Sequence, residues 1–194
     1  MKVTRKKAAE NRDRIVEMAA RLFRERGYEG VGVADLMKEA GLTHGGFYGH
    51  FRSKEELAAE ASSRALADSI RKWDKTASNA TGDPLEAIVT HYLSSKHRAG
   101  TGTGCLFAAL GPEVPRHGLS LKTAVTRGMI PFIDLLARMV PGSSAKARRE
   151  KAIATYAGLI GGMVLARAVS DRSLSNEILQ AVSKSLTETT AVSE

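Results

Sequence analysis

Residues 33–51 read VADLMKEAGLTHGGFYGHF, which is the pattern of two short helices joined by a tight turn. Leu36, Met37 and Ala40 give the first helix an apolar stripe at helical spacing. Gly41 can adopt the left-handed backbone conformation that ends a helix, because it has no Cβ atom. The stretch therefore predicts a helical hairpin that turns at Gly41.

The second helix of the hairpin is expected to carry a polar and aromatic outer face. Leu42 should fill the space between the helices, and Thr43 should cap the second one. Phe47 and Phe51 lie four residues apart and should face inward. The side chains left to point outward are those of His44, Tyr48 and His50. Such a face suits readout of the DNA major groove, although a hairpin inside a larger bundle would show the same spacing.

The flanking segments favour DNA binding. An amphipathic helix is predicted over residues 9–26, closed by Gly27 and Tyr28. Its apolar face consists of Ile15, Met18, Ala19, Leu22 and Phe23. The basic residues that open the chain are Lys2, Arg5, Lys6 and Lys7. After the hairpin, Ser53 and Glu56 have the spacing of a capping box that begins a fourth helix.

Over residues 12–57 this module resembles the N-terminal domain of the TetR/AcrR family of bacterial transcriptional regulators. The matching segments are Ile15–Val16, Ala19–Phe23, Gly27–Tyr28, Val33–Leu36, Ala40–Thr43, Gly45, Phe47–Tyr48, His50–Phe51 and Ser53–Leu57. The resemblance implies an all-α protein that binds double-stranded operator DNA as a homodimer and is released by a small-molecule effector.

The resemblance and the outward face together indicate the DNA contacts. The residues expected to meet base edges or nearby phosphates are Thr43, His44, Gly46 and His50. Tyr48 and Lys54 are expected to donate to phosphate oxygens. These side chains come from the second hairpin helix and from the first turn of the helix that follows it.

Two glycines depart from the family pattern. Gly32 stands where the family usually has Thr or Ser, so the first hairpin helix should lose its side-chain cap. Gly46 stands where the family often has a small side chain. With Gly45 and Gly49 it puts three glycines in one short helix, and each costs roughly 0.5–1 kcal/mol relative to Ala. We therefore expect a recognition helix that is frayed when free and becomes ordered on DNA.

Charge and composition agree with a DNA-binding protein. The 194-residue chain has a net charge of +8, and residues 1–54 contain 12 Lys and Arg against 7 Asp and Glu. A concentrated basic region is typical of a phosphate-binding surface, although a solvated face would give the same count. No apolar run is long enough for a membrane span, and no secretory signal is visible. The single cysteine favours a reducing cytoplasm.

The rest of the chain is expected to be helical. The predicted helices cover residues 53–79, 84–97, 105–110, 120–139 (kinked at Pro131), 145–170 and 175–189. Residues 98–104 form a loop whose glycines do not complete a nucleotide-binding motif, and no strand precedes them. Interrupted helices in mid-chain leave room for a cavity, although irregular packing would show the same pattern.

The last two helices are predicted to form a dimer interface. A stripe of small residues lies on the first of them, at Ala154, Gly158, Gly162 and Ala166. The apolar face of the second consists of Ile178, Leu179, Val182 and Leu186. Glycines cost helix stability, so close approach of another helix should compensate. That helix could instead belong to the same chain.

An effector pocket is expected in the C-terminal part, as the resemblance implies. Its candidate lining residues are Trp73, His91, Tyr92, Cys105, Phe107, Met129, Phe132, Ile133 and Leu136, most of which could equally be core. Cys105 follows the glycine-rich loop and opens an apolar helix, where a helix dipole favours the thiolate. It is a candidate for sensing electrophiles, the alternative being an inert buried thiol.

Together these patterns predict an all-α protein with two parts. Residues 1–52 would form the helix-turn-helix DNA-binding domain, and residues 53–194 the helical ligand-binding and dimerisation domain. No catalytic motif or metal-ligand spacing is visible, so we expect a regulator with no cofactor and no enzymatic activity. The alternative is a helical small-molecule or redox sensor without specific DNA binding.

Overall fold

The computed structural model describes residues 5–188 and is helical, with no strand among those residues. The helices in chain order are α1 (Arg5–Arg26), α2 (Val33–Glu39), η1 (His44–Gly49), α3 (Lys54–Ser78), α4 (Pro84–Tyr92), α5 (Ser95–Ala99), η2 (Thr101–Thr103), α6 (Leu106–Leu110), η3 (Val114–Arg116), α7 (Leu119–Ala137), α8 (Ala145–Ala168) and α9 (Arg172–Glu188). The predicted all-α class is confirmed. Lys2 and the predicted helix end at residue 189 lie outside the described residues.

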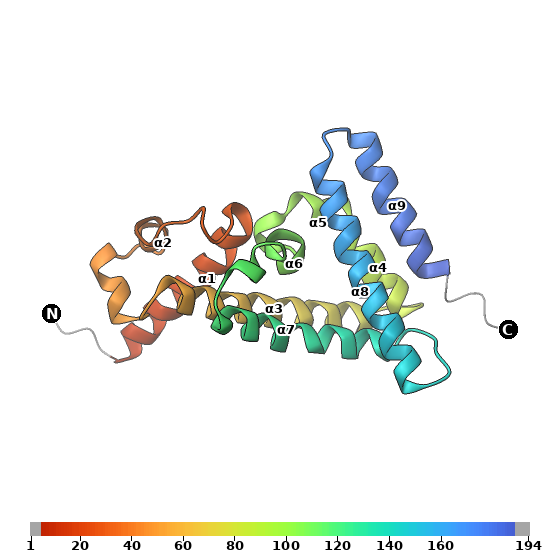
Figure 1. Ribbon diagram of the computed structural model, residues 1–194, viewed down its shortest axis with the longest axis horizontal. Helices are drawn as coiled ribbons and strands as arrows, with labels where there is room; N and C mark the ends of the chain where they lie inside the picture. Colours follow the sequence, from red (N-terminus) through yellow and green to blue (C-terminus); the bar gives the residue numbers. More distant parts are fainter. Residues whose placement is uncertain (1–4, 189–194) are drawn as a thin grey trace.

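Figure 1 shows an elongated arrangement in which the long helix α3 joins the two ends. Helices α1 and α2 lie at the N-terminal end, and α1 packs against α3. Helix α7 runs beside α3 along most of its length, and α8 crosses α7 and pairs with α9. Within residues 5–188, no helix is both long and apolar enough to cross a membrane.

Helix α3 begins where the sequence predicted a capping box. The Ser53 hydroxyl accepts a hydrogen bond from the Glu56 backbone N–H at 3.1 Å. The Glu56 carboxylate accepts from the Arg52 backbone N–H at 2.7 Å, one residue earlier than in the standard box. Both bonds satisfy donors at the helix entrance and fix the junction between the hairpin and α3.

The middle of the chain departs from the predicted helices. The single helix expected over 84–97 is wrong, because α4 ends at Tyr92 and α5 begins after Ser94. The Ser94 hydroxyl accepts from the His97 N–H at 3.2 Å, so this serine caps a new helix instead of continuing the old one. The expected loop over 98–104 contains the end of α5 and all of η2. Pro131 lies inside α7.

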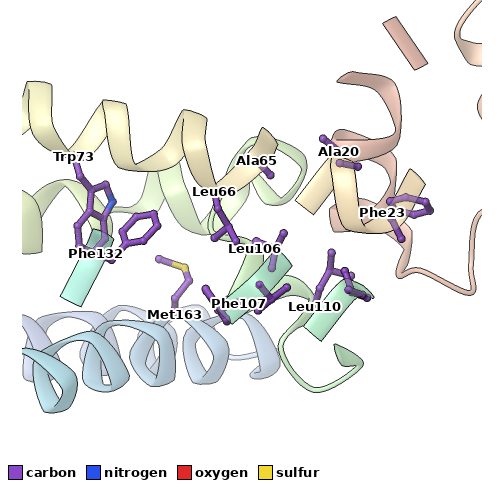
Figure 2. Close-up of a cluster of buried hydrophobic side chains, with 14 of the residues drawn as sticks. Ala20, Phe23, Ala65, Leu66, Trp73, Leu106, Phe107, Leu110, Phe132 and Met163 are labelled. Atoms are coloured by element: carbon purple, nitrogen blue, oxygen red, sulfur yellow. The ribbon is translucent and has the colours of Figure 1, made fainter. Parts of the chain in front are cut away.

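One hydrophobic core runs through both parts of the molecule. In Figure 2, Trp73 and Phe132 lie at one end of the cluster and Phe23 of α1 at the other. Between them lie Leu106 and Leu110 of the short helix α6. Helix α6 therefore connects the centre of the C-terminal part to the packing surface of α1.

Candidate nucleic-acid interface and ligand cavity

The hairpin turns at Gly41 in the predicted way. Gly41 has a φ of 69°, in the left-handed region that favours glycine. Its N–H donates to the Lys38 carbonyl at 3.0 Å, and the Leu42 N–H donates to the Met37 carbonyl at 2.8 Å. This pair of bonds is a Schellman motif, which satisfies the last carbonyls of α2 and aims the chain into the next helix.

The recognition helix η1 is a 3₁₀ helix of six residues, not an α-helix. Thr43 occupies its N-cap position, but the predicted side-chain cap is wrong: no such bond forms, and the Gly46 N–H instead donates to the Thr43 carbonyl at 3.0 Å. Phe47 and Phe51 are buried as predicted, with ring centroids 5.6 Å apart. These two rings anchor a helix that has few backbone bonds of its own.

Gly45, Gly46 and Gly49 leave the surface of η1 without side chains at three positions. A Cβ atom added at Gly45 or Gly49 would meet nothing within 4 Å, and one at Gly46 would make ordinary contacts at 3.6 Å. None of the three has a positive φ. Their backbone conformation therefore does not require glycine. Gly32 caps α2 without a side-chain bond, as its identity predicted.

The predicted DNA contacts come from η1 and the start of α3. Thr43, His44 and Tyr48 are exposed, and the Tyr48 side chain is 68% exposed although it is large and aromatic. Gly46 and His50 are half-buried. Lys54 is half-buried too, and its ammonium lies 3.6 Å from the carboxylate of the exposed Glu29. A phosphate approaching Lys54 would have to replace this ion pair.

A Schellman turn between α2 and the short, largely exposed η1 is the arrangement found in DNA-binding units of the helix-turn-helix class. Residues 15–61 match the sequence model described as bacterial regulatory proteins, tetR family. These residues therefore form the N-terminal domain of the TetR family of bacterial regulatory proteins.

Curated relatives and solved structures extend this likeness beyond the DNA-binding part. The chain is 26% identical over 152 residues to the transcriptional repressor NemR of Escherichia coli, covering 77% of this chain and 74% of NemR. It is 30% identical over 116 residues to the repressor DhaR of a Mycobacterium species, covering 60% and 58%. The fold matches the reduced form of E. coli NemR with a TM-score of 0.77, at 24% identity over 92% of this chain and 96% of that one. A TetR-family regulator from Cytophaga hutchinsonii matches with a TM-score of 0.78, at 18% identity over the whole of both chains.

A cavity of about 590 Å³ opens in the C-terminal part. Apolar side chains line one portion, and polar or basic ones line the rest. The lining residues are Leu66, Ser69, Lys72, Trp73, Thr90, His91, Tyr92, Ser94, Lys96, His97, Gly100, Thr103, Gly104, Cys105, Leu106, Phe132 and Tyr156. A space of this size suits a small molecule.

The cavity brings together some of the predicted pocket residues and leaves out others. Those that line it are Trp73, His91, Tyr92, Cys105 and Phe132. Those that do not are Phe107, Met129, Ile133 and Leu136, which pack in or against the core. Sequence reasoning missed Tyr156 and His97, because no local pattern shows which face of α8 or α5 turns toward the cavity.

His97 organises the wall around Cys105. Its Nε2 accepts from the Cys105 backbone N–H at 2.9 Å, so the ring proton sits on Nδ1, which donates to the Tyr92 carbonyl at 2.6 Å. Burial lowers the pKa of His97 and so favours this neutral form. Helix α6 has five residues, so its dipole gives little support for a thiolate at Cys105.

The small-residue stripe of α8 packs inside one chain. A Cβ atom added at Gly158 would lie 3.3 Å from Leu186, and one at Gly162 would lie 3.1 Å from Val182, both on α9. Ala166 and Leu179 are buried, Ile178 is half-buried, and Ala154 is exposed. These contacts account for the two glycines without a second chain, so the dimer stays a prediction.

Proposed function

We propose that this chain is a repressor that binds a palindromic operator as a homodimer and releases it when a small molecule fills the cavity. Its main support is the exposed face of η1, held by the Schellman turn at Gly41 and anchored by two buried phenylalanines. The relatives named above are transcriptional repressors. In this proposal residues 1–52 read DNA and residues 53–194 bind the effector and the second chain.

The exposed face of α8 supports dimer formation. Ile153 and Leu165 are 47% and 55% exposed, and a Cβ atom added at Gly161 between them would meet nothing within 4 Å. These residues lie on the side of α8 that α9 leaves uncovered. A second copy that packs there would bury this apolar face and hold two recognition helices at a fixed separation, as a palindromic operator requires.

A direct contact joins the cavity wall to the DNA-binding part. The Arg24 guanidinium of α1 donates two hydrogen bonds to the Gly102 carbonyl, at 2.8 and 2.5 Å. Gly102 lies in η2, three residues before Cys105. A second contact joins the Tyr28 N–H to the Glu113 carboxylate at 2.9 Å, just beyond α6. We propose that effector binding shifts this segment and, through Arg24, moves α1.

Cys105 gives the cavity a second mode of response. Cys105 is half-buried and lines the cavity, so an electrophile that enters the cavity would lie beside it. The E. coli relative NemR was solved in a form described as reduced, so redox states are distinguished for that protein. We propose that electrophiles which modify Cys105 act as effectors of this chain.

Fluorescence anisotropy tests the proposed function. The labelled duplex is the promoter DNA beside the chain's own gene, titrated at several salt concentrations with scrambled duplex as competitor. We expect binding that survives the competitor and weakens steeply with salt, because lysines and arginines displace counterions from phosphates. Binding that the competitor abolishes, both on this duplex and on DNA selected from random sequence, would contradict the proposal and favour a sensor without specific DNA binding.

A further inference from the structure

Two buried tyrosine hydroxyls near Cys105 have no oxygen or nitrogen as a hydrogen-bond partner, and Tyr92 has only the weakly accepting Cys105 thiol beside it. Among the described residues, the buried unpartnered polar side-chain atoms are Tyr92 Oη, Tyr156 Oη and Arg167 Nη1. Tyr92 and Tyr156 are only 2% and 4% exposed, and both line the cavity. Buried hydroxyls in proteins are nearly always paired, so two hydroxyls at a cavity wall without an oxygen or nitrogen partner indicate that the occupant supplies the acceptor.

The two phenols are held near each other and near the thiol. The Trp73 ring packs edge-on against both, with centroid distances of 5.6 Å to Tyr92 and 5.9 Å to Tyr156. Burial raises the pKa of each phenol well above its ordinary value, and the Cys105 thiol adds to both shifts. Both hydroxyls therefore stay protonated and are available to donate hydrogen bonds to an oxygen of the ligand.

The rest of the cavity favours an electron-rich oxygen on an apolar ligand body. Lys72 and Lys96 line the cavity, and none of its lining residues is Asp or Glu. Behind the lining residue His97, the half-buried Arg167 guanidinium donates only to the His97 and Arg98 carbonyls and leaves Nη1 unpaired. Leu66 and Phe132 supply apolar surface to the same cavity. Such surroundings stabilise partial negative charge on a buried ligand oxygen.

We propose that the Tyr92 and Tyr156 hydroxyls donate hydrogen bonds to the carbonyl oxygen of a conjugated ketone or quinone. These bonds would activate the β-carbon of the ligand for addition of the Cys105 sulfur. The inference rests on the proposed role of the cavity as the effector site. In the step, the Cys105 sulfur bonds to the β-carbon, and the displaced π electrons move to the carbonyl oxygen. That oxygen takes the two tyrosine hydrogen bonds, and the proton lost by the thiol ends on the resulting enolate.

Binding of an unreactive ketone tests recognition alone. Trp73 is the only tryptophan of the chain and lines the cavity, so its fluorescence reports occupancy. We expect wild type to bind acetophenone about tenfold more tightly than ethylbenzene, which has nearly the same shape but no acceptor. Tyr92→Phe and Tyr156→Phe should each reduce that preference, and the double variant should abolish it. Tyr28→Phe is the matched control, because the Tyr28 hydroxyl is bonded to Ser62 outside the cavity.

Reaction rates test the activation. Alkylation of Cys105 by cyclohexenone, followed by mass spectrometry of the whole protein, should slow about tenfold in each tyrosine variant. Exchange of the same thiol with 4,4′-dithiodipyridine, which has no carbonyl, should be unchanged. A double variant that keeps the ketone preference, or that slows both reactions equally, would overturn the proposal. These readings use no DNA, so they are independent of a failure of operator binding.

Discussion

His97 joins two parts of the cavity wall through both of its ring nitrogens, and only its neutral form can do so. A proton on Nε2 would remove the acceptor for the Cys105 N–H. Because burial lowers the pKa of His97, the unfolded chain takes up this proton at a higher pH than the folded chain. The stabilisation is therefore complete above a pH of about 6.5, the ordinary histidine pKa, and is lost as the pH falls through the lower folded value.

Urea unfolding between pH 8 and pH 5 measures this effect. We expect the free energy of unfolding of wild type to decline below a pH of about 6.5 more steeply than that of His97→Gln. His44→Gln is the control, because His44 is exposed on η1. Parallel pH profiles for wild type and His97→Gln would show that His97 does not titrate on unfolding.

Lys54 is expected to bind a phosphate only after it leaves Glu29. Lys54→Ala should weaken binding to all DNA sequences about equally and reduce the slope of log affinity against log salt by about one. Glu29→Gln should raise the affinity for DNA, because it removes both the competing carboxylate and a negative charge near the DNA. Salt titrations by fluorescence anisotropy read both effects, and weaker binding by Glu29→Gln would refute the proposed competition.

At the scale of single elements, the glycines of η1 lower the stability of this helix and leave its outer surface without side chains at their positions. Gly45→Ala and Gly49→Ala should each raise the free energy of unfolding by roughly 0.5–1 kcal/mol, because the backbone is ordinary and the space is open. Gly41→Ala should lower it by about 1–2 kcal/mol, since its φ is positive. Urea denaturation compares the three. Destabilisation of the Gly45→Ala and Gly49→Ala variants as large as that of Gly41→Ala would contradict this prediction. It would mean that the fold requires glycine at positions 45 and 49.

The segment from η2 to α6 is the element that should carry the effector signal. Arg24→Met keeps a long apolar side chain but loses both bonds to the Gly102 carbonyl. We expect it to bind operator nearly as wild type does, yet to release it several-fold less in response to effector. Arg21→Met is the control, because Arg21 pairs with Glu25 and Glu39 instead. An unchanged effector response, measured by anisotropy, would exclude this contact as the route.

Local chemistry explains which elements could be predicted from sequence. The turn depends on Gly41 and on the residues beside it, and the start of α3 depends on Ser53 and Glu56. Both features could therefore be predicted from the local sequence. The break at Ser94 was not, because its hydroxyl can cap a new helix or remain within an old one. The placement of Tyr156 in the cavity depends on how α8 packs against distant helices. A small-residue stripe shows that a helix approaches closely, but not which chain supplies it.

At the scale of the whole molecule, the exposed side of α8 should determine the oligomeric state. Leu165→Asp places a charge on this face, 55% exposed in one chain, and should convert a dimer into monomers. Leu119→Asp is the control, because Leu119 is 80% exposed at the start of α7. Sedimentation velocity gives the state of each variant. A Leu165→Asp protein that sediments like wild type would place any interface elsewhere.

In the proposed dimer, two copies of η1 read base sequence in one operator. Selection of bound duplexes from random DNA by the full chain, followed by sequencing, tests it most directly. We predict convergence on an inverted repeat whose half-sites lie about one helical turn apart, because a twofold dimer presents two equivalent recognition helices. Bound sequences that show no common site, or a site without twofold symmetry, would contradict the claim.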